Sequence, residues 1–243
     1  MSTAAFPRDI NFVKVGAVAA FLLAATLVAG MASFFALSDA TPRAEAEEFL
    51  DDVVDKRILY IAVVWLWAFS ALLRVPFALG LYYGLRRWGE DYMRVAVLFA
   101  VVAALLFALS WAPVAARAAY IVPAWGEASD EATRAMLLSD ARTLAWVSDA
   151  MISMFLVAIG IAFIAFSLVM LWLGQLLWTV LGWIGIVAGV LFILGALALA
   201  AEGFMIAAII GTILEIIWLL GAGVGLWRLP AEEEAQPETS GRQ

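Results

Sequence analysis

Six long apolar runs constrain the fold of this 243-residue chain more than any other feature. An α-helix needs about 20 largely apolar residues to cross roughly 30 Å of hydrocarbon at about 1.5 Å per residue. The runs cover residues 15–37, 58–85, 95–114, 144–173, 176–201 and 204–227. The sequence therefore predicts an all-α membrane protein, a polytopic bundle of six transmembrane helices within residues 1–230.

Composition agrees with this prediction. Apolar residues make up 66% of the chain and charged residues 14%, and the mean hydropathy is +1.01. The first run is longer than the apolar region of about 7–15 residues that a cleaved signal peptide carries, so we expect it to be retained as a helix. The acidic segment 231–243 is predicted to be a disordered tail, because it has too little apolar surface to pack.

The loop between the first two runs predicts a short amphipathic helix outside the membrane. Thr41 followed by Pro42 is typical of a helix start. One face of the helix would be apolar and the other acidic. The apolar face comprises Phe49, Leu50, Val53 and Val54. The acidic face is either a solvated surface, the interpretation that we favour, or a vestibule that attracts cations.

The loop between the third and fourth runs predicts a second such helix. It opens after Pro123, and a helical stretch begins near Ser129 and passes through Met136 and Leu137. This stretch can end in the loop or run into the fourth span. Both loop helices would lie on the extracytoplasmic side.

Orientation follows from the basic residues, which resist translocation. The basic residues of one side crowd short segments: Arg8, Lys14, Arg86, Arg87, Arg94, Arg228 and Arg242. This pattern predicts a protein of the cytoplasmic membrane with both termini in the cytoplasm. Tryptophans near the run ends predict anchoring in the lipid headgroups on both sides. These residues are Trp88, Trp172, Trp178 and Trp227 on the inner side, and Trp111, Trp125 and Trp146 on the other.

Missing residue types exclude several function classes. The chain has no histidine and no cysteine, which rules out disulfides, thiol chemistry, bis-histidine haem and histidine-rich metal centres. A net charge of −7 without a basic patch argues against nucleic-acid binding. We expect no cofactor, no metal and no enzymatic activity, and the lipid bilayer is the one partner that the sequence indicates.

Ionisable residues within the apolar runs are the best candidates for a functional site, since each is costly in lipid unless it finds a partner. Arg74 lies 12 residues before Arg86, and Glu215 lies 13 residues before Arg228. Both are therefore roughly 18–20 Å from the same membrane boundary. We predict that Arg74 and Glu215 face each other as an ion pair near mid-membrane.

A second, shallower pair is predicted between Arg117 and Asp149. Asp149 lies a few residues inside the fourth run, and Arg117 follows the third run at a comparable level. Alternatively, Asp149 reaches water by itself and Arg117 extends into the headgroups, because charges near the interface cost less than charges at the midplane.

Glycine spacing predicts close helix packing. Gly80 and Gly84, and likewise Gly185 and Gly189, have the four-residue spacing that lets helices approach. Packing within the chain is the simpler interpretation, and homo-oligomerisation through such a face is the alternative. The short Gly174–Gln175 link requires the fourth and fifth helices to form an antiparallel hairpin.

The carboxy-terminal half shows a family resemblance. Its fifth apolar run contains Leu181-Gly182, Gly185 and Gly189, and its last run contains Trp218-Leu219-Leu220. This pattern resembles a prokaryotic family of six-helix membrane proteins of unknown function. The resemblance implies the six-helix bundle and implies no reaction.

Three function classes follow from these observations. The chain can be an accessory or structural protein, or a small carrier or sensor whose midplane pair binds a proton, an ion or a small amphiphile. A membrane enzyme that acts on lipid is the least favoured class, because Asp149 and Glu215 are expected at different depths and no nucleophile–base pair accompanies them.

Overall fold

The structure, a computed structural model, describes residues 12–36, 46–199 and 204–229. Every element in these ranges is helical. The elements are α1 (Phe12–Ala36), α2 (Ala46–Asp55), α3 (Arg57–Leu85), η1 (Arg86–Trp88), α4 (Glu90–Ala116), η2 (Arg117–Ile121), α5 (Val122–Glu127), α6 (Glu131–Trp172), α7 (Leu176–Gly195), η3 (Ala196–Leu199) and α8 (Phe204–Arg228). The predicted cap at Thr41 and Pro42, the side chain of Phe49 and the tail 231–243 lie outside the described residues.

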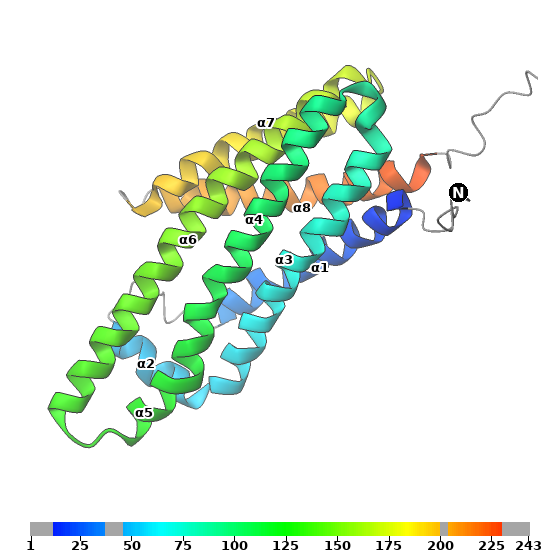
Figure 1. Ribbon diagram of the computed structural model, residues 1–243. Coiled ribbons are helices and arrows are strands. Elements are labelled where there is room, and N and C mark those ends of the chain that lie inside the picture. Colours follow the sequence, from blue (N-terminus) through cyan, green and yellow to red (C-terminus); the bar gives the residue numbers. More distant parts are fainter. Residues whose placement is uncertain (1–11, 37–45, 200–203, 230–243) are drawn as a thin grey trace, which may run out of the picture.

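Six of these helices are long and apolar enough to cross a membrane, which confirms the predicted membrane bundle. They are α1, α3, α4 with its continuation to Glu127, α6, α7 and α8. Each packs against the next along the chain, and α8 packs against α1, so the six helices close a ring. Figure 1 shows α7 and α8 crossing behind the long diagonal helices α3, α4 and α6.

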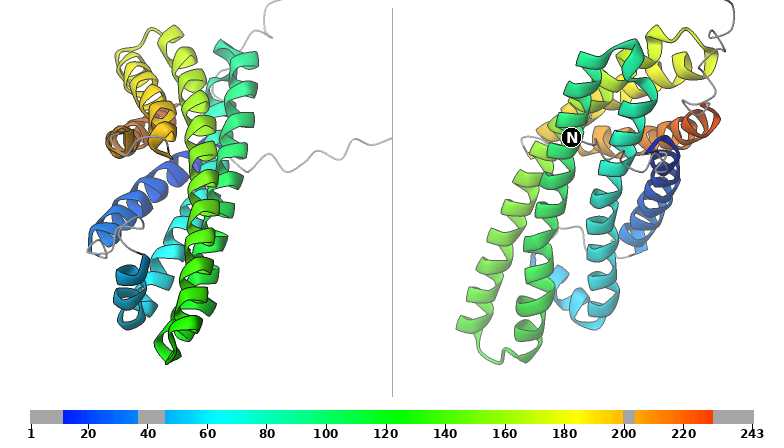
Figure 2. Two further views of the ribbon diagram at one scale, coloured as in Figure 1. Left: turned by 90° about the vertical axis from the view of Figure 1, so that its left-hand side faces the viewer. Right: turned by 45° about the vertical axis from the view of Figure 1, so that its right-hand side comes forward.

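The two sides of the ring differ in shape. We call proximal the side on which α1 begins, α8 ends and the turns at Gly89 and Gly174 lie, and distal the opposite side. On the distal side α3, α4 and α6 extend well beyond α7 and α8 (Figure 2). With 42 residues, α6 is roughly 63 Å long, about twice the thickness of a bilayer's hydrocarbon.

The start of α6 resolves the alternatives left open for the second loop. Residues 131–143 are polar, but they form the first turns of α6 and run directly into the predicted fourth span. The chain has neither glycine nor proline between Glu131 and Ile159, so nothing interrupts the helix. The helix starts at Glu131, two residues later than the predicted Ser129, because Asp130 caps it by accepting a hydrogen bond from the Thr133 amide at 2.8 Å.

A helical head forms where these helices project. It comprises α2, η2, α5 and the distal turns of α3 and α6, which enclose a small apolar core of their own. The predicted amphipathic helix is present as α2, with Leu50 and Val53 buried in this core. Trp125, from α5, fills its centre and donates its indole N–H to Asp51 at 2.7 Å.

Tryptophan positions correct part of the predicted headgroup belts. Trp125 and Trp178 are each only 2% exposed and pack in the two cores, and Trp111 packs against the ring's interior. Trp172 and Trp227 are exposed near the proximal ends of α6 and α8, as the prediction requires.

Glycines bring the ring helices into backbone contact. Gly16 of α1 meets Gly80 of α3 backbone to backbone. A Cβ on Gly189 of α7 would lie 2.7 Å from the carbonyl oxygen of Gly160 in α6. Gly80 and Gly189 thus serve packing within the chain. Gly174, with φ of +66°, forms the turn of the predicted α6–α7 hairpin.

A buried ion pair and a polar column as candidate functional site

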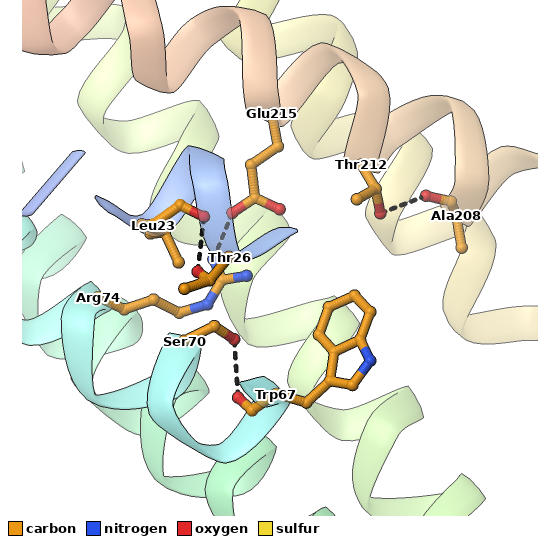
Figure 3. A network of polar contacts seen from close by, with 8 residues as sticks. All are labelled: Leu23, Thr26, Trp67, Ser70, Arg74, Ala208, Thr212 and Glu215. Atoms are coloured by element: carbon orange, nitrogen blue, oxygen red, sulfur yellow. Dashed lines mark hydrogen bonds and ion pairs between the residues drawn. The ribbon is translucent and has the colours of Figure 1, made fainter. Parts of the chain in front are cut away.

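Arg74 and Glu215 form an ion pair inside the ring, as predicted. The guanidinium Nη1 of Arg74 donates to Oε1 of Glu215, and the two side chains are only 4% and 2% exposed. Figure 3 shows Arg74 reaching from α3 toward Glu215 on α8, with Thr26 of α1 beside them. The two helices lie opposite each other in the ring and otherwise make little contact, so the pair bridges its interior.

Aromatic rings from two further helices surround the guanidinium. The centroids of Phe107 on α4 and Phe155 on α6 lie 5.6 and 5.2 Å from Arg74 Cζ. The two rings stack on each other at 4.5 Å. Such cation–π contacts stabilise a desolvated guanidinium, and the low dielectric strengthens its attraction to the carboxylate. Four helices therefore contribute to the environment of one charge pair.

One guanidinium donor remains without a partner. Nε of Arg74 is buried and makes no hydrogen bond with any residue that the structure describes. A buried N–H without an acceptor is costly, and in proteins such groups usually bind an ordered water or a ligand atom. The ion pair thus has one unmet hydrogen bond on a fully buried group.

Polar groups continue from the pair toward the distal side. On α3, Ser70 and Trp67 precede Arg74 by one and two turns, and the Ser70 hydroxyl donates to the Trp67 carbonyl at 2.7 Å. On α4, Ser110 and Trp111 follow Phe107 by one turn. The hydroxyl of Ser148 on α6 donates to the Ser110 carbonyl at 2.9 Å. We call Ser70, Trp67, Trp111, Ser110 and Ser148 the polar column.

Both tryptophans of the column face the interior of the ring. The Trp67 indole packs against Gly30 of α1 and stacks on Trp111 of α4 at 5.8 Å, so it touches both neighbours of its own helix. The Nε1 atoms of Trp67 and Trp111 are buried and have no hydrogen-bond partner within the described ranges. The column therefore carries two further donors of the same kind as Arg74 Nε.

The distal end of the column lies where the ring meets the head. Here the backbone widens into the π-helical turn η2, a deviation that is frequent at functional sites. Arg117 of this turn is buried and donates to the Tyr60 hydroxyl at 3.2 Å. Asp149 is half-buried at a comparable height on α6, the helix next to α4. The ion pair predicted between Arg117 and Asp149 stays a prediction.

On α3 and α4 the proximal side of the pair is apolar by contrast. The buried residues that follow Arg74 on α3 are apolar or glycine as far as Leu85. On α4 the buried residues on the proximal side of Phe107 are alanines and Met93. The fully buried side chains that close this side include Leu81, Leu85, Met93, Val169, Met170 and Leu226.

Two more buried polar atoms lie beside α7, on the proximal side of the pair and away from the column. Ser167 Oγ and Trp218 Nε1 flank Gly185 and make no hydrogen bond to the residues described. The Trp218 ring is enclosed by Phe77, Phe163 and Phe166. A Cβ on Gly185 would lie 2.7 Å from Trp218 Nε1, so only glycine fits there without displacing the tryptophan.

Sequence reasoning found the charged pair and missed the column. Ser70 was detectable, because it lies one turn from Arg74 on the same helix face. Trp67, Trp111 and Tyr60 gave no such signal, since an aromatic residue in an apolar run faces lipid as readily as protein. Within the described ranges no three acidic side chains gather as a metal site.

Comparison with known proteins identifies a family and no activity. Searches of curated proteins and of solved structures gave no significant match. The model of one family, described as Domain of unknown function (DUF4386), matches residues 18–223 and so covers all six spans in whole or in large part. The chain therefore belongs to the DUF4386 family of proteins of unknown function.

Proposed function

We propose that this protein is an accessory, structural component of the cytoplasmic membrane, in which the ring of six helices holds the helical head at the extracytoplasmic surface. Both termini then lie in the cytoplasm, and the proximal side faces it. The lipid bilayer is the partner of the ring. The Arg74–Glu215 pair serves as the tie that fixes α3 against α8 across the interior.

The burial of the pair carries this proposal. Both side chains are less than 5% exposed, and aromatic rings from α4 and α6 cover the guanidinium. A binding site for a transported solute must open to one side during each cycle, whereas a tie works best when it is enclosed. Buried polar pairs can fix helix register in this way.

A double-mutant cycle tests the tie. Glu215→Gln and Arg74→Gln each leave one buried charge without its partner, which we expect to cost about 3–5 kcal/mol. The double variant should recover much of that loss, because neither uncompensated charge remains. Unfolding of the protein in lipid nanodiscs, followed for the wild type, both single variants and the double variant, measures the coupling.

A matched control and two opposite outcomes complete this experiment. Glu90→Gln removes the exposed carboxylate that pairs with Arg94 and should change stability by less than about 1 kcal/mol. Strong coupling that does not respond to candidate ions supports the structural role. Single variants that fold normally and lose an ion-dependent stabilisation would contradict it.

A small carrier or sensor is the second candidate function, and one observation favours it. Arg74 Nε, Trp67 Nε1 and Trp111 Nε1 are three buried donors that lie along one interior path and lack acceptors in the described part of the chain. A purely structural interior gains nothing from unmet donors, because each costs about 1–3 kcal/mol. An ion-dependent shift in the stability of the wild type that Glu215→Gln abolishes would favour this class.

A further inference from the structure

We propose that the polar column binds a file of water molecules, which hydrates the Arg74–Glu215 pair from the distal side only. The ligand is water, held by Trp67 Nε1, Trp111 Nε1 and Arg74 Nε, with the buried serines beside it. This inference goes beyond the accessory role and holds whether the pair acts as a tie or as a binding site.

The donors supply the first part of the argument. Each of the three N–H groups is buried and finds no acceptor among the described residues. Water is the acceptor that best fits all three, because it can accept from one group and donate to the next. The carboxylate of Glu215 can in turn accept from such a water, since an ionised carboxylate has about four acceptor positions and Arg74 Nη1 uses one.

The spacing supplies the second part. Ser70, Trp67 and Tyr60 precede Arg74 by 4, 7 and 14 residues on the same face of α3. At about 1.5 Å per residue, they lie roughly 6, 10 and 21 Å from the pair along the helix. Ser110 and Ser148 stand on the two helices that follow α3 around the ring and are joined by a hydrogen bond. Polar groups thus recur at short intervals from the midplane to the head.

The direction of access follows from what borders the pair on each side. On α4, the buried face carries Ser110 and Trp111 on the distal side of Phe107, but alanines and Met93 on the proximal side. Fully buried aliphatic and methionine side chains from α3, α4, α6 and α8 close the proximal end. The two buried polar atoms on that side, Ser167 Oγ and Trp218 Nε1, lie beside α7, and the rings of Phe77, Phe163 and Phe166 enclose the indole. Water in an apolar, close-packed layer would lack hydrogen-bond partners, so the file ends at the ion pair.

Single cysteines test this proposal in a chain that has none of its own. Ser110→Cys places a thiol in the column, and Ala103→Cys places one two turns away on the same face of α4, on the proximal side of Phe107. Both native residues are fully buried. Protein in lipid nanodiscs is exposed to silver ion, a small thiophilic cation, and the thiols left after denaturation are then counted with a fluorescent maleimide.

The proposal expects Ser110→Cys to react with silver ion at least tenfold faster than Ala103→Cys. Ser148→Cys, at the same level of the column, should react about as fast as Ser110→Cys. Equal rates at Ser110→Cys and Ala103→Cys would overturn the proposal. This outcome leaves the Arg74–Glu215 tie untouched, because the double-mutant cycle measures that tie independently.

Hydroxyl-radical footprinting of the wild type gives a second answer that does not depend on a variant folding. Radiolysis makes radicals from water in place, so buried side chains next to internal water are oxidised. Phe107 and Phe155, which are buried beside the pair, should be oxidised several-fold more than Phe163 and Phe166, which are similarly buried on the proximal side. Oxidation of all four phenylalanines at the same rate would overturn one-sided hydration.

Discussion

The ring and the head share α3 and α6 and are organised in opposite ways. In the ring, large apolar side chains such as Trp65, Leu72 and Leu98 are exposed on the outside, and an ion pair is enclosed within. In the head, charged residues such as Arg134 lie outside, and an apolar core lies within. The difference is clearest along α6, where exposed charged residues of the head give way to exposed apolar residues of the ring without a break in the helix.

The contacts of the two regions also differ in kind. Ring helices meet backbone to backbone at glycines such as Gly16 and Gly80. Head elements are joined by polar side chains: Trp125 to Asp51 at 2.7 Å and Arg57 to the Ala118 carbonyl at 3.1 Å. Lipid offers no hydrophobic driving force between helices, so the ring depends on close packing. Water does provide a hydrophobic driving force, and the short helices of the head accordingly bury apolar side chains around Trp125.

The largest effect that separates the two regions is expected at Trp125. Trp125→Ala removes the central side chain of the head's core and leaves Asp51 without its donor, which should cost the head about 3–5 kcal/mol. Hydrogen exchange should show α2 and α5 losing protection while α7 and α8 keep theirs. Trp65→Ala, at a side chain that is 70% exposed, is the control and should leave both regions intact. Loss of protection throughout the ring would show that the head is no separate unit.

The next effect concerns the junction of the two regions. Tyr60→Phe removes the hydroxyl that accepts from the buried Arg117 at 3.2 Å. A hydrogen bond to a charged group contributes about 1.5–3 kcal/mol, so unfolding in nanodiscs should begin at lower denaturant concentration. Tyr120→Phe, an exposed residue of the same π-helical turn, is the matched control. Equal stabilities for the two variants would mean that the junction does not depend on this bond.

Glycine substitutions compare packing in the ring with packing in the head. Gly80→Ala forces a methyl group into the backbone of α1 at Gly16, which neither helix can relieve without moving apart, and should cost about 1–3 kcal/mol. Gly126→Ala in α5 places its Cβ 3.5 Å from Val54, an ordinary contact. Alanine lowers the conformational entropy of the unfolded chain, so Gly126→Ala should be neutral or stabilising by up to about 1 kcal/mol. Thermal unfolding of both variants tests whether Gly80→Ala is the less stable of the two.

The smallest effect is a pH dependence confined to the head. The Thr133 side chain, and then the Thr133 amide, hydrogen-bond Asp130 and lower its pKa below the usual 3.8. A lowered pKa adds stability that is present above pH 3.8 and disappears as the pH falls through the lower folded value. Asp130→Ala should therefore weaken hydrogen-exchange protection at the start of α6 at neutral pH, and this difference from wild type should shrink in acid.

Asp130→Asn sharpens that measurement. Asparagine caps helices about as well as aspartate but does not titrate between neutral pH and acid. The start of α6 in this variant should keep its protection across the whole pH range. A variant whose protection falls in acid as the wild type's does would place the titrating group elsewhere in the head.

The sequence predicts those features that depend only on how deep a residue lies within its span. Arg74 and Glu215 could be matched because each lies a countable distance from a basic residue at the same boundary, and a charge at that depth needs a partner. The start of α6 was harder, because residues 131–143 are polar enough for a loop and regular enough for a helix. The absence of glycine and proline from residues 131–159, rather than their hydropathy, explains why this segment continues the helix.

The polar column could not be predicted for a different reason. Trp67 and Trp111 point inward because Gly30 on α1 leaves room for one indole and the two rings stack on each other. Such a contact joins three helices that are far apart in sequence, and no spacing within one helix encodes it. Predicting the contact requires knowing which helices are neighbours in the ring.

The length of α6 has a mechanical consequence. A continuous helix of 42 residues behaves as a stiff rod of roughly 63 Å. If this rod pivots by about 5° at the Gly174 turn, its far end at Glu131 travels roughly 5 Å, while side chains near the pivot scarcely move. Because α6 alone joins that turn to the far tip of the head, it acts as a lever. Small changes in the tilt of the α6–α7 hairpin become displacements of atomic size at the opposite surface.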